Sequence, residues 1–317
     1  MTRETLADAI AVMVQIAVLL FLSPFITGFG RTLKARLQTR RGPQVWQPYR
    51  DLYKLARKGM VLPETASWIF SATPFVLFAT TLLAGLLIPA ISAEAPLSLF
   101  GGVLAVVYLL ALGRFFLALA GLDTGSSFGG LGSSREMTIS AIAEPALMLA
   151  VFTVAIGAGS TNLSLVAHAA LGQSWRFLAP QQMLAFAALF IVLIAETGRI
   201  PVDNPATHLE LTMIHEAMIL EYSGPYLALI EWSAAMKQLV LMTLLVNVFF
   251  PWGLSAGWSP AGLILSSIVF VGKLLALAVV VALVETANAK LRLFRVPELL
   301  AAAFVLSALA LISTFLF

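Results

Sequence analysis

Long apolar runs alternate with short charged segments along the whole chain. Crossing a bilayer takes about 20 apolar residues, and eight runs reach or approach that length. They are Leu6–Phe29, Ser67–Ile91, Leu97–Leu122, Met137–Gly159, Gln182–Ala195, Tyr226–Phe250, Pro260–Val284 and Pro297–Leu316. No polar linker interrupts the series. The pattern predicts an all-α fold: a polytopic integral membrane protein of about eight transmembrane helices in a single domain, 1–317.

Composition supports the membrane class and limits the chemistry. The chain is 60% hydrophobic and 11% charged, whereas a soluble domain carries about 25% charged residues. It has no cysteine, which excludes disulfides, thiolate-held iron–sulfur clusters and covalent haem attachment. Any iron–sulfur chemistry coupled to this protein must therefore sit on another chain.

Positive charge is concentrated in alternate loops. Segments 30–66, 123–136, 196–225 and 285–296 hold fourteen of the nineteen Lys and Arg residues. Cytoplasmic loops carry such an excess of basic residues. The sequence therefore predicts that these loops are cytoplasmic and that both termini lie outside.

The first of these loops is the most basic. It contains Arg40, Arg41, Arg50 and Lys54, opposed by few acids such as Asp51. One interpretation is that it sets topology and contacts the headgroups of the lipid bilayer. The other is that it docks a cytoplasmic subunit. Its place at a membrane argues against nucleic acid as a partner.

Five charged side chains lie well inside the predicted spans, beyond the first turn. They are Arg114, Glu144, Glu231, Lys237 and Lys273. Each costs about 2.5–3.5 kcal/mol at the centre of an isolated inserted helix, so each needs a partner, water or a neighbouring subunit. Such groups either hold helices together or form a proton relay. Lysines on two separate spans favour the relay.

The segment 196–222 carries an unusual number of titratable groups for so apolar a chain. Its carboxylates and histidines are Glu196, Asp203, Glu210, Glu216, Glu221, His208 and His215. Arg199 is its only full positive charge. We expect this segment to handle protons or to contact a charged partner.

Two apparent motifs in the charged loops are incomplete. His215-Glu216 begins an HExxH pattern, but Ile219 replaces the second ligand. His208 and His215 alone make an incomplete metal site, so no metal is expected. The glycine run in 125–132 lacks the spacing of a phosphate-binding loop and is interpreted as a pliable inner loop.

Three segments of the cytoplasmic loops carry a family resemblance. The first is Arg40-Arg41-Gly42-Pro43 with Gln47-Pro48-Tyr49, Asp51 and Lys54-Leu55; the second is Gly121-Leu122 with Arg135, Ser140 and Glu144; the third is Glu196-Thr197, Arg199, Pro201 and Asp203, closing at Glu221-Tyr222. Together they resemble the membrane subunit that forms the floor of the quinone chamber in respiratory complex I. Ala143 and Gly198 depart from that pattern. The string DNPATHLELTMIHEAMILEYSG is more similar to the corresponding subunits of complex I-like [NiFe] hydrogenases of the formate hydrogenlyase and hydrogenase-4 type.

The resemblance implies a subunit that is not catalytic on its own and has no cofactor. It implies an anchor, in the inner membrane of a prokaryote, for a small iron–sulfur subunit and a large nickel–iron subunit. Antiporter-like membrane subunits are further implied partners. Docking is implied for Arg40, Arg41, Gly42, Pro43, Arg50, Asp51 and Lys54.

The resemblance also implies a proton path towards the membrane. Its candidate members, by resemblance and intramembrane charge, are Arg114, Glu144, Glu196, Asp203, Glu210, Glu216, Glu221, Glu231, Lys237 and Lys273. Charge partners or gates would be Arg135, Arg199, His208 and His215. A change in charge at the docked redox arm would then shift the protonation of this path.

Two other functions remain open at the level of sequence. The chain is alternatively a true complex I subunit that binds quinone. A stand-alone secondary transporter is the third hypothesis, but such proteins often show internal inverted repeats, and no repeat is evident. The leading expectation is a proton-coupling membrane subunit of a hydrogen-evolving complex.

Overall fold

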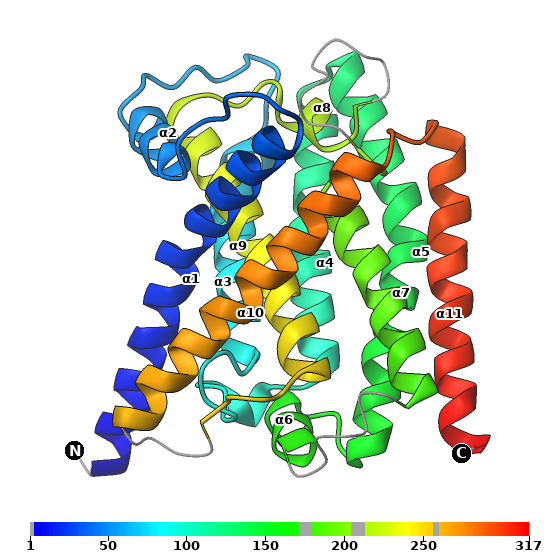
Figure 1. Cartoon of the computed structure of the whole chain (residues 1–317). Helices are drawn as coiled ribbons and strands as arrows, with labels where there is room; N and C mark the ends of the chain where they lie inside the picture. Colours follow the sequence, from blue (N-terminus) through cyan, green and yellow to red (C-terminus); the bar gives the residue numbers. More distant parts are fainter. Residues whose placement is uncertain (1–2, 172–178, 204–212, 256–259, 317) are drawn as a thin grey trace.

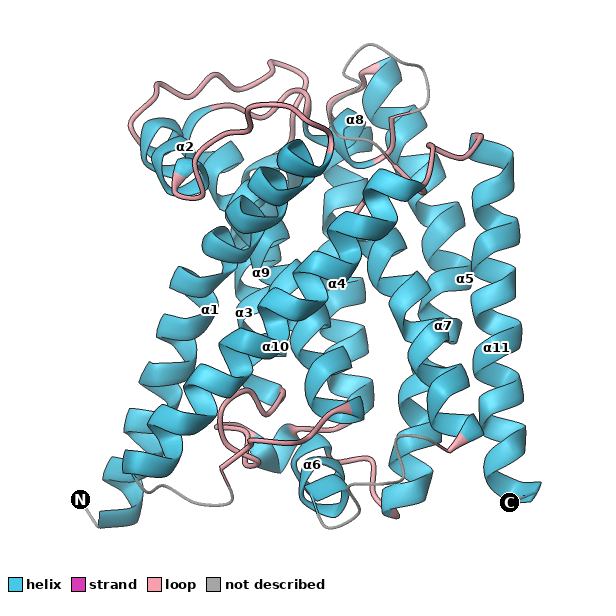
Figure 2. Ribbon diagram, viewed as in Figure 1, coloured by secondary structure: helices cyan, strands magenta, loops and turns pink. Residues whose placement is uncertain are grey.

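The computed structural model describes residues 3–171, 179–203, 213–255 and 260–316, and this part of the chain is a helical bundle (Figures 1 and 2). Its α-helices are α1 (Arg3–Leu37), α2 (Gln47–Ala56), α3 (Trp68–Leu87), α4 (Val103–Asp123), α5 (Ser127–Ala158), α6 (Leu163–Leu171), α7 (Pro180–Glu196), α8 (His215–Ile219), α9 (Gly224–Phe249), α10 (Pro260–Ala287) and α11 (Val296–Leu316). Short 3-10 turns occupy Ser98–Phe100 and Leu293–Arg295. The described residues form only isolated β-bridges. The predicted all-α fold is confirmed.

Seven helices of the described chain are long and apolar enough to cross a membrane. They are α1, α3, α4, α5, α9, α10 and α11. Helix α7 is also apolar but has only 17 residues. The protein is therefore a multi-pass membrane protein, while the count of eight spans and the sides of the termini stay predictions.

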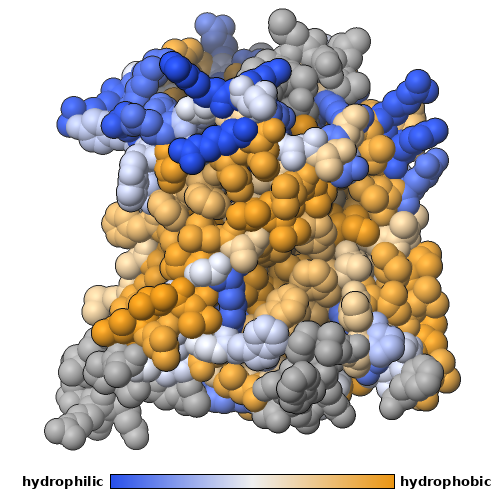
Figure 3. All heavy atoms as spheres, viewed as in Figure 1, coloured by the Kyte–Doolittle hydropathy of each residue, from blue (hydrophilic) through white to orange (hydrophobic). Residues whose placement is uncertain are grey.

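The charged segments gather at one end of the bundle. Helices α2 and α8 lie at the end opposite both chain termini (Figure 1). Blue, hydrophilic side chains crowd this end in the space-filling view, and an orange apolar band covers the middle of the molecule (Figure 3). The charged loops therefore share one end of the bundle, while the side of the membrane that they face stays a prediction.

Helix α9 has an interior position that brings several helices together. It contacts α1, α2, α3, α7 and α10, while α11 packs against α5 and α7. The side chains of α9 from residue 238 to 249 are all buried. Polar side chains on this part of α9 therefore face other helices and can form hydrogen bonds or ion pairs with their side chains.

The glycine-rich segment was predicted to be a loop, and that prediction was wrong. Helix α5 already begins at Ser127, after Ser126 accepts a hydrogen bond from the Gly129 amide at 3.1 Å. A Cβ at Gly129 would lie 2.2 Å from the Gly121 carbonyl oxygen of α4. Glycine is needed here for the close approach of two helices. The early start of α5 places Glu136 inside a helix and beside the site described next.

Candidate functional site

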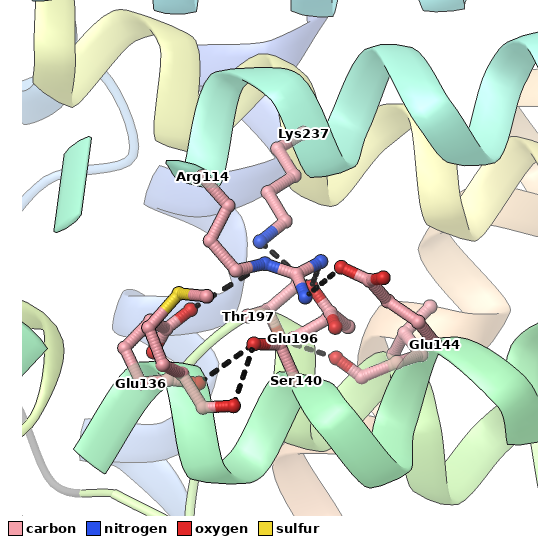
Figure 4. A network of polar contacts seen from close by, with 9 residues as sticks. Arg114, Glu136, Ser140, Glu144, Glu196, Thr197 and Lys237 are labelled. Atoms are coloured by element: carbon pink, nitrogen blue, oxygen red, sulfur yellow. Dashed lines mark hydrogen bonds and ion pairs between the residues drawn. The ribbon is translucent and has the colours of Figure 1, made fainter. Parts of the chain in front are cut away.

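Arg114 is the centre of a buried ionic cluster in the middle of α4. Its Nη1 donates to Glu144 Oε1 of α5 at 2.8 Å, and its Nη2 donates to Glu196 Oε2 of α7 at 2.7 Å (Figure 4). Its Nε lies 3.7 Å from Glu136 Oε1, also on α5. Only 6% of the Arg114 side chain is exposed. One guanidinium thus joins three carboxylates from two neighbouring helices.

Lys237 of α9 completes this group, which we call the Arg114 cluster. Its Nζ lies 2.8 Å from Glu196 Oε2, so Glu196 is shared by two cations. Glu196 is 5% exposed and Glu144 is 33% exposed. With every group ionised, two cations and three carboxylates give a formal charge of −1. The cluster therefore holds one carboxylate more than it has cations.

A small cavity of about 90 Å³ lies beside the Arg114 cluster. Arg114, Glu136, Glu196 and Lys237 line it together with His215. A polar cavity of this size has room for water, which needs several polar partners to be held. The cluster therefore adjoins a space large enough to hold water.

A second ionic group, which we call the Glu285 cluster, joins the helices α1, α9 and α10 with the turn that follows α7. The buried Glu285 carboxylate lies 2.8 Å from Lys34 Nζ and 2.6 Å from Arg199 Nη1. Arg199 Nη2 also donates to Gln238 Oε1 at 2.7 Å. Gln238 follows Lys237 directly in α9, so neighbouring residues of one helix belong to the two clusters.

Asp203 links the acidic segment to the loop that follows α10. Its side chain is buried, accepts a hydrogen bond from the Ile214 amide at 3.2 Å, and lies 3.3 Å from Lys290 Nζ. Arg135 Nη1 of α5 donates to the Met213 carbonyl at 2.9 Å. These contacts hold Asp203, Met213 and Ile214 against the bundle.

Three cavities follow one another from the Arg114 cluster outward. The first shares Asp203 and His215 with a second of about 170 Å³, which Arg199 and Glu285 also line. The second shares Lys34, Glu216 and Glu231 with a third of about 580 Å³, reaching α2 and Asp51. Residues that line neighbouring cavities therefore connect α2 to the Arg114 cluster.

The structure unites some predicted site residues and separates others. Glu144, Glu196, Lys237 and Arg114 meet in one cluster, and Arg199, Asp203, His215, Glu216 and Glu231 line the cavities next to it. Glu221 is exposed at the turn before α9. Lys273 donates to the Phe250 carbonyl at 2.5 Å, at the opposite end of α9 from that turn. Glu210 and His208 lie outside the described residues.

The predicted docking loop forms the surface beside the third cavity. Arg40, Arg41, Gly42, Pro43, Arg50 and Lys54 are exposed, and Asp51 is half-buried and accepts a hydrogen bond from Gln47 Nε2 at 2.8 Å. A Cβ at Gly42 would lie 2.5 Å from the Ala35 Cβ, so the loop folds tightly back onto α1. Its cations therefore point outward from a fixed backbone.

Several partners in the site were not predicted from the sequence. They are Lys34, Glu136, Gln238, Glu285 and Lys290. Glu136 and Glu285 were assigned to inner loops, at the borders of apolar runs. The arginines already singled out were a usable signal, because each buried cation needs carboxylates within reach. Acidic residues at the loop borders are the nearest carboxylates that such a cation can meet.

Tyr222, at the end of the acidic segment, packs against α3. Its ring stacks on Phe70 with centroids 3.9 Å apart, and its hydroxyl donates to the Phe70 carbonyl at 2.9 Å. Burial raises the pKa of the Tyr222 phenol well above its usual value. The neutral phenol is therefore a structural donor.

The described residues contain no group of three or more His, Asp or Glu side chains placed to hold a metal ion.

Comparisons with known proteins agree on one family. The family model described as NADH dehydrogenase matches residues 9–316. Hydrogenase-4 component C of Escherichia coli (strain K12) is 36% identical over 312 residues, which are 97% of each chain. Formate hydrogenlyase subunit 4 of the same strain is 36% identical over 305 residues, covering 95% of this chain and 97% of its own.

More distant relatives extend the same pattern. A subunit of the NADH-quinone oxidoreductase of Caulobacter vibrioides is 28% identical over 267 residues, which cover 78% of this chain and 72% of the relative. One chain in a structure of the membrane-bound sulfane sulfur reductase, an archaeal respiratory membrane complex, has the same fold, with a TM-score of 0.85, 21% identity, and coverage of 97% and 99%. The resemblance seen in the three loop segments is confirmed. The chain belongs to the NADH dehydrogenase subunit 1 family.

Proposed function

We propose that this chain is the membrane-anchor and proton-coupling subunit of an energy-converting, hydrogen-evolving [NiFe] hydrogenase complex of the formate hydrogenlyase type. The observation that carries the proposal is the buried Arg114 cluster, whose carboxylates exceed its cations by one. The 36% identity to Hydrogenase-4 component C and Formate hydrogenlyase subunit 4 over nearly the whole chain supports the hydrogenase branch. In this proposal the chain itself holds no cofactor and is not catalytic alone.

The coupling acts through charge. Electron transfer in a docked hydrophilic arm changes the charge near the third cavity, and Arg199 with Glu285 lies between that cavity and the Arg114 cluster. A more negative arm favours proton uptake by nearby carboxylates, because a like charge disfavours the ionised form. The interacting groups then titrate as one unit. Protons received by Glu196 and Glu144 pass on to neighbouring membrane subunits.

His215 provides the step between the first two cavities. Its side chain lines both. An imidazole can accept a proton on one nitrogen while donating from the other. Asp203 lines both cavities as well, but it is ion-paired with Lys290. His215 is therefore the shared group best suited to pass protons between the clusters.

Partners follow from where the exposed charge lies. The basic surface of Arg40, Arg41, Arg50 and Lys54 docks the arm formed by the iron–sulfur small subunit and the nickel–iron large subunit. Antiporter-like membrane subunits pack against the apolar sides of the bundle. The complex resides in the inner membrane of a prokaryote, with the charged loops in the cytoplasm. The iron–sulfur clusters and the nickel–iron centre belong to the partner subunits.

The test replaces Glu196 by glutamine in the intact complex. Inverted membrane vesicles receive electrons from a reduced viologen dye, and hydrogen evolution and acidification of the vesicle lumen are recorded together. Glu196→Gln keeps the shape and the hydrogen-bond acceptor but removes one negative charge, so the cluster is already neutral. We expect an assembled complex in which the ratio of protons moved to hydrogen released is at least halved.

Two further variants make the test specific. Glu144→Gln is expected to lower the same ratio, since Glu144 shares Arg114 with Glu196. The control is Glu298→Gln, an exposed carboxylate on α11, which should leave the ratio unchanged. Wild-type ratios in both Glu196→Gln and Glu144→Gln would remove these residues from the path and refute the coupling role.

A quinone-binding complex I subunit is the second candidate. The observation in its favour is the third cavity, about 580 Å³ and bordered by α1 and α2, together with 28% identity to the NADH-quinone oxidoreductase chain of C. vibrioides. Assays of the purified complex for quinone reduction and for hydrogen evolution decide between the two. Quinone reduction without hydrogen evolution would establish this second candidate.

A further inference from the structure

Helix α10 carries an uncovered apolar face. It crosses the bundle obliquely, and its main contacts are with α1 and α9 (Figure 1). Large apolar side chains on its outer side are exposed: Ile264, Leu265, Ile268, Val280 and Leu283. Such a face meets either lipid or another membrane protein.

Lys273 lies at the edge of this face, halfway along α10, and is partly exposed. Its ammonium donates to the Phe250 carbonyl at 2.5 Å. Of the Asp and Glu side chains in the described segments, none lies within 4.0 Å of the Lys273 ammonium; the described ion pairs involve other cations. One neutral carbonyl satisfies one of its three N–H donors. The charge of Lys273 is therefore not balanced within the described chain.

The position of Lys273 along α10 keeps its backbone far from the lipid headgroups. Lys273 is 13 residues from Pro260 and 14 residues from Ala287, the two ends of α10. At 1.5 Å per residue, each end is about 20 Å away along the helix axis. The Lys273 ammonium extends towards the C-terminal end of α9, where Phe250 lies, and a charge that stays within the apolar band remains costly. A countercharge at the same depth is the more favourable solution.

The backbone beside Lys273 is open to a close approach. Gly272 and Ala276 are both exposed and lie four residues apart on the outer face. A Cβ added at Gly272 would meet nothing within 4 Å. Two small residues at this spacing let a second helix come near in a membrane. Lys273 would then lie directly beside the crossing point.

We propose that a transmembrane helix of a second membrane subunit packs on Gly272 and Ala276 and pairs an ionised Asp or Glu with Lys273. A carboxylate at this depth would accept the two remaining ammonium donors. The pair would fix both the register and the orientation of the two subunits, since each unpaired charge would be costly in lipid. This inference depends only on the chain having a membrane partner, and not on proton coupling through Arg114.

A photo-crosslinking experiment on the intact complex identifies the occupant of the face. A benzophenone amino acid replaces Ala276, the membranes are irradiated, and the products are identified by mass spectrometry. We expect one dominant product, with a transmembrane helix of another subunit that contains Asp or Glu near the crosslinked position. Products confined to lipid would overturn the proposal, and so would a partner helix without a carboxylate.

Charge variants at Lys273 test the pair itself. The complex is purified through a tag on this chain, and the amount of the crosslinked subunit that it retains is measured. Lys273→Met is expected to lower retention several-fold, whereas Lys273→Arg keeps the charge and retains the subunit. Leu283→Met, on the same face, is the matched control. Full retention in Lys273→Met would overturn the proposal.

A charge exchange separates pairing from a general packing defect. Lys273→Glu alone should release the partner, and replacing the partner's carboxylate by lysine in the same complex should restore it. Failure of the exchange to restore retention would contradict a direct ion pair. Because proton transport does not enter these readouts, they remain informative whatever the outcome of the Glu196→Gln test.

Discussion

Removing the Arg114 guanidinium should destabilise the whole bundle. Arg114→Leu leaves Glu136, Glu144 and Glu196 facing Lys237 alone, so the formal charge of the cluster changes from −1 to −2. Two hydrogen bonds of 2.7 and 2.8 Å are lost in the same step. Leucine fills part of the space, but it cannot balance any of the carboxylates.

The expected loss follows from the burial of the group. Arg114 and Glu196 are 6% and 5% exposed, and breaking such a buried pair from one side costs about 3–5 kcal/mol. That is a large share of the roughly 5–15 kcal/mol that stabilises a folded domain. The corresponding fall in the thermal midpoint is on the order of 10 °C.

Thermal stability of the detergent-solubilised protein measures this loss. A fluorescent fusion is heated in steps, and the folded fraction is read by size-exclusion chromatography. Arg292→Leu removes an exposed arginine and serves as the control. We expect a fall in the midpoint for Arg114→Leu and none for the control.

A second substitution decides whether charge is the cause. In Arg114→Leu with Glu196→Gln, one cation and one carboxylate are both gone, and the formal charge returns to −1. The double variant should therefore be clearly more stable than the sum of the two single changes predicts. Strictly additive losses would refute the electrostatic account of the cluster.

Three further predictions concern the frame around the site. Asp123→Ala should cost about 0.5–2 kcal/mol in the same thermal assay, because its carboxylate accepts two backbone amides at the start of α3, whereas Asp123→Asn should cost less. Gly132→Val should displace α8, since even a Cβ would lie 2.9 Å from the Ile214 carbonyl, and it should lower accumulation in membranes. The raised pKa of Tyr222 adds stability below the unfolded value of about 10 that is lost as pH rises above it; Tyr222→Phe should flatten this alkaline slope.

The lengths of the apolar runs predicted most of the helices because lipid imposes a simple rule. A crossing must be long, apolar and helical, and the predicted runs overlap every long helix of the described chain. The predicted boundaries were wrong where the close packing of neighbouring segments determined where a helix begins. Gly129 and Gly132 suggest a loop by composition, but in α5 they allow close contacts with α4 and with the segment at α8.

The candidate site was predictable in kind but not in its connections. Arg114, Glu144 and Lys237 stand out in the sequence because a charge within an apolar run is costly unless it is paired or functional. Which carboxylate meets which cation depends on how α4, α5, α7 and α9 are rotated and tilted against one another. Composition carries no such information, so the separation of Lys273 from the Arg114 cluster could not be foreseen.

The length of α7 explains how the acidic segment enters the bundle. Its 17 residues span about 25 Å, less than the roughly 30 Å of a hydrocarbon core. The helix ends at Glu196, and the chain turns at Gly198, which has a φ of 58° that glycine adopts readily. A full-length helix would carry the carboxylate towards the surface. The short helix instead leaves Glu196 at the depth of Arg114, near the middle of α4, and draws the loop that follows inward. The position of the cluster therefore depends on a helix that stops early.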